Sequence, residues 1–273
     1  MEDITASIVL YNTNIQEVHA ITNTLLKTER FKHLYIIDNS PSPISEYSKS
    51  KKVSYIFNGK NLGYGMAHNI AIKKAIKENS KYHIVMNTDI KFSTNVLPSI
   101  AQYMDTHTDV GQIMPKVNYK DGKIQYLCKL LPNPFDLFIR RFLPSNLFNA
   151  SRDKFILKES NYNRIMNIPC LSGCFMFLRI DTLKEIGLFD ERYFLYMEDF
   201  DLTRRIHNKY KTIFYPHCNI VHYEGKGSYK KLKLLFYHAI NAIRYFNKWG
   251  WVFDKERSTI NYNITNNYIS QEN

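Results

Sequence analysis

Residues 5–11, Thr-Ala-Ser-Ile-Val-Leu-Tyr, open the pattern that decides the fold. An apolar run of this length with β-branched side chains, followed by polar residues, predicts a strand. Asn14 then provides an N-cap, with Glu17 three residues later in a capping-box arrangement, and an apolar helical face runs from Val18 to Leu25. The stretch therefore predicts a strand followed by an amphipathic helix.

The same alternation continues through the first half of the chain. Apolar runs at residues 34–38, 53–57 and 82–87 predict three more strands, and alanines recur on one side of the helix before the last of them. Strands that alternate with helices favour a mostly parallel sheet covered by helices. The first half therefore predicts an α/β fold.

The second half is less regular. Its pattern predicts a helix at 95–107, a strand at 111–117, a hairpin turn at Asp121–Gly122 and a strand at 169–178 entered through a loop. Residues 132–166 carry several prolines and predict an irregular insertion or mobile flap. Residues 228–248 have apolar residues at helical spacing with a basic margin, and the Asn-rich residues after Asp254 predict a disordered tail.

The charge balance points to an anionic partner. The 273 residues contain 37 Lys and Arg against 25 Asp and Glu, a net charge of +12. This excess suits a nucleotide diphosphate, phospholipid head groups or nucleic acid. No known nucleic-acid-binding motif is present, and the aromatic residues lie in core-like runs, so we expect no nucleic-acid partner.

The cysteines and the first residues predict a cytoplasmic protein. The four cysteines lack paired CxxC spacing, and Met1-Glu2-Asp3 is acidic where a signal sequence starts with basic residues. Reduced thiols in the cytosol are the simplest interpretation. No apolar run approaches the roughly 20 residues needed to span a bilayer, so any membrane contact is expected to be peripheral.

Polar residues gather where the predicted strands end. These positions are Asn12, Asp38, the segment 58–65 and the segment 87–89. Ligands of open α/β sheets bind beyond the carboxyl ends of the strands, so these ends predict a binding site. The alternative is that they are ordinary turns, which are rich in Asn, Asp and Gly.

A second candidate site lies at residues 198–201, Glu-Asp-Phe-Asp, which place three carboxylates in four residues. They follow the aromatic and apolar run 192–197. Carboxylates this close need a cation, hydrogen-bond partners or a proton-transfer role to offset their repulsion and desolvation. We interpret the stretch as the floor of an active site, while the alternative is a helix start at which acids favour the positive dipole end.

Several motifs together resemble family 2 glycosyltransferases of the GT-A fold. They are VLYN at 9–12, IIDN at 36–39, NGKNLGYGMAHN at 58–69, MNTD at 86–89, SGC at 172–174 and FLYMEDFD at 194–201. The resemblance runs in order from about residue 5 to residue 249 and is nearest to the branch often described as rhamnosyltransferases. It implies a nucleotide-diphospho-sugar transferase fold, with a mixed, mostly parallel central sheet flanked by helices and a C-terminal amphipathic helical extension.

The resemblance also implies a division of the chain. The glycosyltransferase domain would span residues 1–227, with a nucleotide-sugar-binding half at about 1–117. An acceptor and catalytic half would follow at 118–227 and contain the irregular insertion at 132–166. An amphipathic helical extension at 228–253 and a disordered polar tail at 254–273 would complete the chain.

The resemblance assigns donor-binding roles to residues near the strand ends. Tyr11 and Asn12 would flank the nucleotide base, and Asp38 would accept a hydrogen bond from the base or the ribose. The alternative for Asp38 is an Asx-turn. The remaining donor-binding positions that it implies are Asn61, Gly63, Asn69, Asn87, Thr88, Arg204 and Arg205.

A divalent cation is part of the same expectation. The family commonly carries an Asp-x-Asp motif whose last Asp binds the metal, and here it reads Asn87-Thr88-Asp89. Asp89 would bind Mn²⁺ or Mg²⁺ through oxygen, and His222 matches a position where some relatives supply a histidine. The alternative for His222 is a polar loop residue. The amide of Asn87 in place of a carboxylate predicts weaker metal affinity.

The resemblance implies an inverting hexosyltransferase. Asp199 would act as the base that takes the proton of the acceptor hydroxyl, and Glu198 would orient or bind the acceptor. Asp201 would brace Arg204 or Arg205, which could reach the diphosphate. The alternative is an i,i+3 or i,i+4 surface pair between Asp201 and one of these arginines.

The substrates implied are a nucleoside-diphosphate sugar, linked to dTDP or UDP with rhamnose as a candidate, and a glycan or polyprenyl-linked acceptor in cell-surface polysaccharide synthesis. Residues 228–251 would supply a peripheral contact with the inner face of the membrane. The alternative for this helix is packing on its own domain. The alternative for the whole protein is a non-catalytic nucleotide-sugar-binding protein with a degenerate metal site.

Overall fold

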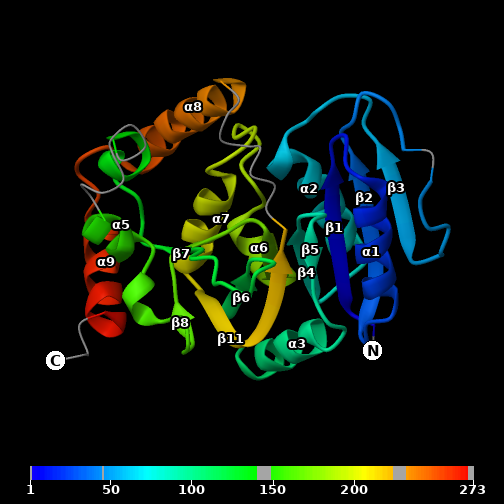
Figure 1. Cartoon of the computed structure of the whole chain (residues 1–273), viewed down its shortest axis with the longest axis horizontal. Helices are drawn as coiled ribbons and strands as arrows, with labels where there is room; N and C mark the ends of the chain where they lie inside the picture. Colours follow the sequence, from blue (N-terminus) through cyan, green and yellow to red (C-terminus); the bar gives the residue numbers. More distant parts are fainter. Residues whose placement is uncertain (1, 45, 140–148, 224–231, 270–273) are drawn as a thin grey trace.

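The structure is a computed structural model that describes residues 2–44, 46–139, 149–223 and 232–269. Its centre is a mixed sheet (Figure 1). The strands, in spatial order, are β3 (Val53–Phe57), β2 (Phe31–Asp38), β1 (Ile4–Leu10), β4 (Tyr82–Met86), β10 (Phe175–Arg179), β6 (Val110–Asn118), β11 (Lys211–His222) and β5 (Ile90–Lys91), and β8 (Met166–Asn167) pairs with β11. A separate pair is formed by β7 (Cys128–Lys129) and β9 (Cys170–Leu171).

The pairing is mostly parallel, as the alternation of strands and helices predicts. Strands β1, β2, β3 and β4 are parallel to their neighbours among themselves, and β6 is parallel to β11. Strand β10 is antiparallel to both β4 and β6, so it joins the first half of the chain to the second. The predicted division near residue 117 therefore falls inside β6, and both halves share one sheet.

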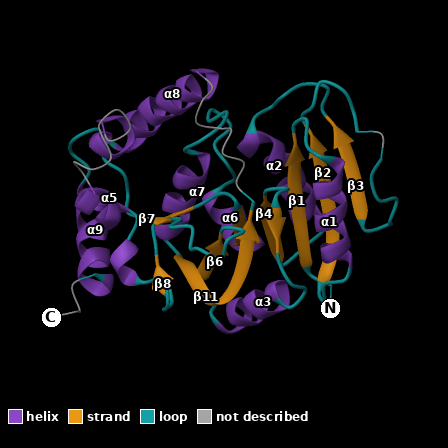
Figure 2. Cartoon of the chain, in the orientation of Figure 1, coloured by secondary structure: helices purple, strands orange, loops and turns teal. Residues whose placement is uncertain are grey.

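Helices cover both faces of the sheet (Figure 2). They are α1 (Ile15–Leu26), α2 (Tyr64–Lys77), α3 (Val96–Thr106), α5 (Asn149–Phe155), α6 (Ile180–Ile186), α7 (Glu198–His207), α8 (Leu232–Trp249) and α9 (Lys255–Tyr268), with short turns of π-helix at Phe135–Ile139 and 3₁₀-helix at Lys158–Ser160. Buried residues of α1 and α3 share one core cluster, whereas those of α2, α6 and α7 share another. Alternate residues of a strand point to opposite faces, so β1 contributes Ile8 to the first cluster and Val9 to the second.

The start of α1 shows how far the local pattern holds. The side chain of Asn14 caps the helix, as predicted, but it accepts from the N–H of Gln16 at 2.9 Å. The carboxylate of Glu17 accepts from Thr88 Oγ1 at 3.2 Å instead of closing a capping box. The N-cap prediction is confirmed and the capping box is wrong, because a tertiary contact takes the glutamate.

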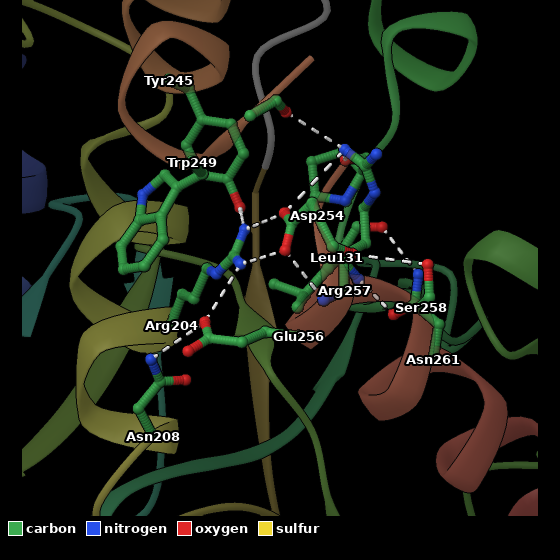
Figure 3. Close-up of polar contacts among 12 residues, drawn as sticks. Leu131, Arg204, Asn208, Tyr245, Trp249, Asp254, Glu256, Arg257, Ser258 and Asn261 are labelled. Atoms are coloured by element: carbon green, nitrogen blue, oxygen red, sulfur yellow. Dashed lines mark hydrogen bonds and ion pairs between the residues drawn. The ribbon is translucent and has the colours of Figure 1, made fainter. Parts of the chain in front are cut away.

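The prediction of a disordered tail is wrong for most of the tail. Residues Lys255–Tyr268 form α9, whose N-cap Asp254 accepts from the N–H of Arg257 at 3.0 Å. The side chain of Asn261 exchanges two hydrogen bonds with the backbone of Leu131, both at 2.9 Å (Figure 3). Polar side chains that composition assigns to solvent are therefore used as contacts to the rest of the protein. Residues 270–273 lie outside the described residues.

The C-terminal helices stand apart from the first strands. Figure 1 shows α8 and α9 at the end of the molecule opposite to β1, β2 and β3. The predicted helix at 228–248 corresponds to α8, and residues 228–231, like 140–148 of the predicted flap, lie outside the described residues. Within the described part of the chain, no helix is long and apolar enough to cross a membrane.

Candidate active site

The carboxyl ends of the first strands meet at one edge of the sheet. In the strand pairing, Leu10 of β1 lies beside Asp38 of β2, and Ile8 of β1 lies beside Met86 of β4. The residues that follow these strands therefore share this edge, as the positions of Asn12, Asp38 and Asn87 in the sequence predict.

Tyr11 and Asn12 end the first strand. The side chain of Tyr11 is 54% exposed, an unusual position for a large aromatic ring at a strand end. Asn12 adopts a left-handed backbone conformation, with φ of 52°, and its N–H donates to Ser40 Oγ at 2.9 Å. The Tyr11 side chain therefore lies at the surface beside this edge of the sheet, and its contact with a base stays a prediction.

Asp38 is fully buried and already has partners. Its carboxylate accepts from the N–H of Ser40 at 2.8 Å, the Asx-turn that the sequence offers as the alternative, and from the hydroxyl of Tyr55 at 2.6 Å. The N–H of Ile44 adds a longer contact at 3.3 Å. Asp38 therefore shapes the loop after β2, and its contact with a base or ribose stays a prediction.

The glycine-containing loop at 61–63 packs against the segment before the acidic residues 198–201. Asn61 Oδ1 accepts from the N–H of Gly63 at 2.9 Å, and the N–H of Tyr64 donates to the carbonyl of Phe194 at 2.9 Å. Gly63 has a φ of +83°, and a Cβ atom there would lie 2.2 Å from the Phe194 oxygen. Only glycine satisfies both conditions, so this residue permits the close approach of the two segments.

Asn69 has a structural role in this arrangement. It is buried in α2, its amide donates to the carbonyl of Phe189 at 2.9 Å and to Glu191 at 3.0 Å, and its oxygen accepts from the N–H of Phe189 at 3.1 Å. These contacts use both the donor and the acceptor side of the amide. They fasten the loop at 189–191 to α2, which is why we do not carry Asn69 into the donor site.

Asp89 and His222 face each other at the next strand end. Asp89 Oδ1 lies 3.3 Å from His222 Nε2. Thr88, between Asn87 and Asp89, turns its hydroxyl toward Glu17 of α1. The motif at 87–89 therefore directs Asn87 and Asp89 toward His222, and Thr88 toward α1.

The hydrogen bonds of His222 fix the orientation of its ring. Gln125 Nε2 donates to the backbone carbonyl of His222 at 2.9 Å, so Gln125 Oε1 accepts from His222 Nδ1, also at 2.9 Å. Nδ1 therefore carries a hydrogen, and Nε2 is the nitrogen that faces Asp89. An imidazole nitrogen and a carboxylate oxygen are both ligand types that a divalent metal accepts.

Asn87 occupies the same space with its amide. Asn87 Oδ1 lies 3.2 Å from the hydroxyl of Tyr64, and Asn87 Nδ2 lies 3.3 Å from His222 Nε2. The side-chain amide of Asn87 therefore contacts the same ring nitrogen that faces Asp89. In the described residues no group of three or more His, Cys, Asp and Glu side chains gathers as a metal site, so a cation here would take further ligands from a diphosphate and water.

Glu198 and Asp199 form a buried pair at the start of α7. Asp199 Oδ2 accepts from the N–H of Gly173 and Oδ1 from the N–H of Phe200, both at 2.9 Å. Burial raises the pKa of Asp199, although these two N–H groups and Lys129 oppose the shift. Burial, and then the charge of Asp199, raise the pKa of Glu198 well above its ordinary value. The pair therefore favours a neutral Glu198 beside an ionised Asp199.

Glu198 is only 5% exposed, and its Oε2 has no hydrogen-bond partner in the described structure. Buried polar atoms are almost always satisfied, so this unpartnered oxygen is available to a ligand.

Tyr64 connects the strand ends to the acidic pair. Its hydroxyl donates to the carbonyl of Gly173 at 2.7 Å and contacts Asn87, while the N–H of Gly173 binds Asp199. Burial raises the pKa of Tyr64 well above its ordinary value, and the ionisable neighbours Cys174, Asp199 and Asp89 act in the same direction. The structure thus brings the motif at 87–89 and the acidic pair around one hydroxyl group.

The sequence did not single out four residues of this site: Tyr64, Gln125, Lys129 and Gly173. Tyr64 and Gly173 lie inside recognised motifs, so their positions were available as signals. Lys129 lies in β7, and its charge opposes the rise in the pKa of Asp199. Gln125 follows a turn. No local sequence pattern distinguishes either residue.

Arg204 does not face the diphosphate site. Its guanidinium donates to Asp254 at 2.8 and 2.9 Å and to Glu256 at 3.3 Å, and it lies 4.0 Å from the ring centre of Trp249 (Figure 3). The side chain of Arg204 is 1% exposed. The expectation that it binds a diphosphate is wrong, because α8 and α9 enclose it.

Arg205 and Asp201 form the i,i+4 pair that the sequence offered as the alternative, but Asp201 is buried and not at the surface. Arg205 Nε donates to Asp201 at 2.8 Å in an i,i+4 pair, and the rest of its guanidinium binds carbonyls of residues 186–188. Asp201 also accepts from Trp249 Nε1 at 2.9 Å and pairs with Lys248 at 2.6 Å. These contacts occupy Arg205, which is therefore also left out of the donor site.

Solved structures share the fold at low sequence identity. At 14% identity each, the chain matches GalNAc-T7 with UDP, GalNAc and Mn²⁺ (TM-score 0.64), S. aureus TarS (0.58) and the mannosyltransferase PcManGT from Pyrobaculum calidifontis in complex with GDP-Man and Mn²⁺ (0.55). The matches cover 93%, 98% and 89% of this chain but 49%, 44% and 64% of those chains. The chain therefore spans about half the length of the first two, and the likeness shows the GT-A fold.

Sequence relatives agree with this fold. The chain is 24% identical over 219 residues to N-acetylglucosaminyl-diphospho-decaprenol L-rhamnosyltransferase of Mycobacterium tuberculosis, in both strain CDC 1551 and strain H37Rv, covering 74% of this chain and 70% of the relative. Residues 6–187 match the model of the family described as Glycosyl transferase family 2. That match includes Asp89 and Gly173 and ends before Glu198. With two thirds of its length matched, the chain belongs to glycosyl transferase family 2 and is a glycosyltransferase of the GT-A fold.

Proposed function

We propose that this glycosyltransferase moves a sugar, with inversion, from a dTDP- or UDP-linked donor to a hydroxyl of a glycan or lipid-linked acceptor in cell-surface polysaccharide synthesis. Rhamnose is the first sugar to test, because the relatives from Mycobacterium tuberculosis are named as rhamnosyltransferases acting on a diphospho-decaprenol. The observation that carries the proposal is the placement of Asn87 and Asp199 on either side of the Tyr64–Gly173 contact.

The donor site in this proposal lies at the carboxyl edge of the sheet. Tyr11 and Asn12 would flank the base, Asp38 would meet the base or ribose, and Asn61 and Gly63 would face the sugar or phosphates. The backbone of the loop at 61–63 approaches closely because Gly63 has no Cβ. Asn87 borders the phosphates from β4.

Asp89 and His222 would hold a Mn²⁺ or Mg²⁺ ion together with the diphosphate. The geometry supports this, because His222 Nε2 lies 3.3 Å from Asp89 Oδ1. Such an ion, when bound, would neutralise charge on the leaving diphosphate. Two structural neighbours were solved with Mn²⁺, so Mn²⁺ is the first metal to test.

Asp199 would be the base of the reaction. As the acceptor oxygen bonds to the anomeric carbon, the bond from that carbon to the diphosphate oxygen breaks on the opposite face, and the acceptor proton passes to Asp199. Its two backbone N–H contacts fix the carboxylate, and its raised pKa brings it nearer to working pH as a proton acceptor. The unpartnered Oε2 of Glu198 would bind the same acceptor hydroxyl or its neighbour.

Release of dTDP from dTDP-rhamnose, or of UDP from UDP-sugars, with Mn²⁺ present tests the proposal. Asp199→Asn should lower kcat by at least about 100-fold, the usual contribution of a positioned base. Asp181→Asn, a matched change at an exposed site of α6, should leave the rate unaltered. Equal rates in the native chain and Asp199→Asn would instead favour a non-catalytic nucleotide-sugar-binding protein, the function that the amide of Asn87 supports.

A membrane contact is part of the proposed function. The turn between α8 and α9 exposes three consecutive apolar residues, Trp251 (39%), Val252 (73%) and Phe253 (94%), beside the basic Lys255. An apolar tip with basic neighbours suits an anionic bilayer such as the inner face of a cell membrane. It would bring the enzyme to a polyprenyl-linked acceptor.

Flotation with anionic liposomes tests this contact. Val252→Ser with Phe253→Ser should reduce the bound fraction several-fold, whereas Tyr262→Ser, which removes another exposed aromatic side chain on α9, should not. Removal of the whole C-terminal segment is unsuitable, because α8 and α9 enclose Arg204 of α7. Equal flotation of the native and doubly substituted proteins would exclude the turn as the contact.

A further inference from the structure

Side chains of helix α8 hydrogen-bond to the segment that leads into the acidic pair. Asn241 Nδ2 donates to the carbonyl of Leu195 at 2.8 Å and lies 3.3 Å from that of Tyr196, and Arg244 donates to the carbonyl of Arg192 at 2.6 Å. The ring of His238, one helical turn before, packs edge-on against Tyr196, with 5.6 Å between centroids. These contacts come from three successive turns of one helix.

The segment that α8 holds is strained. Tyr196 and Met197 have φ values of 70° and 71°, a left-handed conformation that costs a residue with a side chain about 1–2 kcal/mol. We call residues 195–197 the corner. The corner is followed at once by Glu198, the first residue of α7, and Met197 provides no side-chain cap. The direction of the first turn of α7 therefore depends on contacts that keep the corner in place.

Asn241 is built for this contact. It is 1% exposed, and its own oxygen accepts from Arg244 Nη1 at 2.9 Å, which turns the amide nitrogen toward the corner. The amide nitrogen donates to the carbonyl groups of two consecutive residues, Leu195 and Tyr196. No strand or helix uses these carbonyl groups at this point. A buried amide with both sides satisfied fixes one conformation, since its loss would leave carbonyl groups unpaired.

We propose that Asn241 is a positioning residue for the reaction, which holds the corner so that Glu198 and Asp199 face the acceptor site. The role rests on the proposed function of Asp199 as base. This positioning role of α8 is separate from the proposed membrane contact. The inner side of α8 carries Asn241, while Phe236 and Ile243 of the same helix are exposed.

The test combines hydrogen exchange with kinetics. Asn241→Ala removes the donor, and Asn241→Asp keeps the shape of the side chain but replaces the donor by an acceptor. Asn247→Ala is the matched control, because Asn247 lies on the same helix, is exposed, and accepts only from Trp251 among the hydrogen bonds described. Backbone amide exchange in peptides that cover residues 192–201 and dTDP release from dTDP-rhamnose with Mn²⁺ are measured for each.

The proposal expects at least tenfold faster exchange in residues 195–199 for both Asn241 variants, and a kcat at least tenfold lower with a donor KM changed by less than about threefold. Asn247→Ala should match the native protein in both readouts. Unchanged exchange at the corner overturns the proposal. A donor KM that rises, or a dTDP affinity that falls, together with a lower kcat in both Asn241 variants also overturns it, because it would mark a general structural role.

Asp199→Asn, measured beside them, separates the two proposals. If Asp199→Asn loses the rate while Asn241→Ala keeps it, Asp199 stands as the base and the positioning role of Asn241 is wrong. If Asp199→Asn keeps the native rate, the proposed base is wrong, and the role of Asn241 toward it falls with it. Faster exchange at the corner in that case would still show that Asn241 holds the segment.

Discussion

The hydroxyl of Tyr64 donates to the backbone carbonyl of Gly173 at 2.7 Å, although the two residues are 109 positions apart in the chain. Tyr64 begins α2 after the glycine-containing loop, and Gly173 precedes β10. The N–H of Gly173 holds Asp199 on its other side. The backbone of a single residue, Gly173, therefore links the donor edge of the sheet to the acidic pair.

Asn87→Asp is expected to strengthen metal binding. A carboxylate at position 87 would add a second negatively charged group beside Asp89 and His222, so a cation becomes the favoured partner. Mn²⁺ affinity in the presence of dTDP or UDP, followed by electron paramagnetic resonance, should rise about 10–100-fold, the range over which outer-shell changes act. In EDTA the variant should unfold at a lower temperature than the native protein.

The control for added charge is Asn263→Asp, an exposed site on α9 that should alter neither measurement. Equal Mn²⁺ affinity in Asn87→Asp and the native chain would show that the amide does not compete with the metal. The interpretation of the altered motif as a weakened metal site would then be lost.

Gly63→Ala is expected to destabilise the protein and displace the loop. The new Cβ would lie 2.2 Å from the Phe194 oxygen at a φ of +83°. Left-handed strain of about 1–2 kcal/mol and overpacking of about 1–3 kcal/mol add to about 2–5 kcal/mol. Gly122→Ala, at φ +84° with no atom within 4 Å of the new Cβ, carries the strain alone. Chemical denaturation of both variants separates the two contributions, and equal losses would mean that Phe194 yields freely.

The fold was largely predictable because its strands and helices follow local patterns. Residues 53–57 and 82–87 alternate or repeat apolar side chains strongly enough to define β3 and β4, and the polar residues after them mark the binding edge. The start of α1 at Asn14 was equally local. The edge of the site follows from strand direction alone, which is why Asn12, Asp38 and Asn87 lie at the same edge of the sheet.

The rest depends on contacts between distant residues. Arg204 looks like a surface cation within its own helix, and only the return of the chain 50 residues later brings Asp254 against it. Helix α9 has a polar, Asn-rich sequence, and its order depends on contacts such as that of Asn261 with Leu131. Gln125 assigns the proton on His222 from 97 residues away. No local pattern contains this information, because tertiary packing decides which polar groups become partners.

Glu198→Gln is expected to change how stability depends on pH. Burial and the charge of Asp199 raise the folded-state pKa of Glu198 well above its ordinary value near 4.5. The folded protein therefore holds this proton more tightly than the unfolded chain does, and the stabilisation, complete below pH about 4.5, is lost as pH rises through the folded pKa. Glutamine cannot ionise, so the melting temperature of the variant relative to the native protein should rise between pH 5 and pH 9.

Thermal unfolding across that range measures the effect, at about 2–4 °C for each kcal/mol in a domain of this size. Glu185→Gln is a control of opposite sign, because hydrogen bonds with Tyr210 and Lys209 lower the pKa of Glu185. Parallel melting curves for Glu198→Gln and the native protein would contradict a buried, proton-holding Glu198.

Arg204→Met is expected to be among the most damaging single changes in the chain outside the site. The side chains of Arg204 and Asp254 are 1% and 3% exposed, and they share two hydrogen bonds at 2.8 and 2.9 Å (Figure 3). Removing one partner leaves a buried charge without compensation, at about 3–5 kcal/mol. Lys184→Met breaks an exposed pair with Asp181 and should cost about 0–1 kcal/mol.

Urea unfolding of Arg204→Met, Asp254→Leu and the double variant tests whether the pair acts as a unit. The double variant should lose less than the sum of the two single losses, because neither charge is then left alone. Since Arg204 belongs to the helix that begins with Glu198, the single variants should also expose Trp249, which raises the quenching of its fluorescence by iodide. Additive losses no larger than that of Lys184→Met would mean that α8 and α9 do not fasten the catalytic helix through this pair.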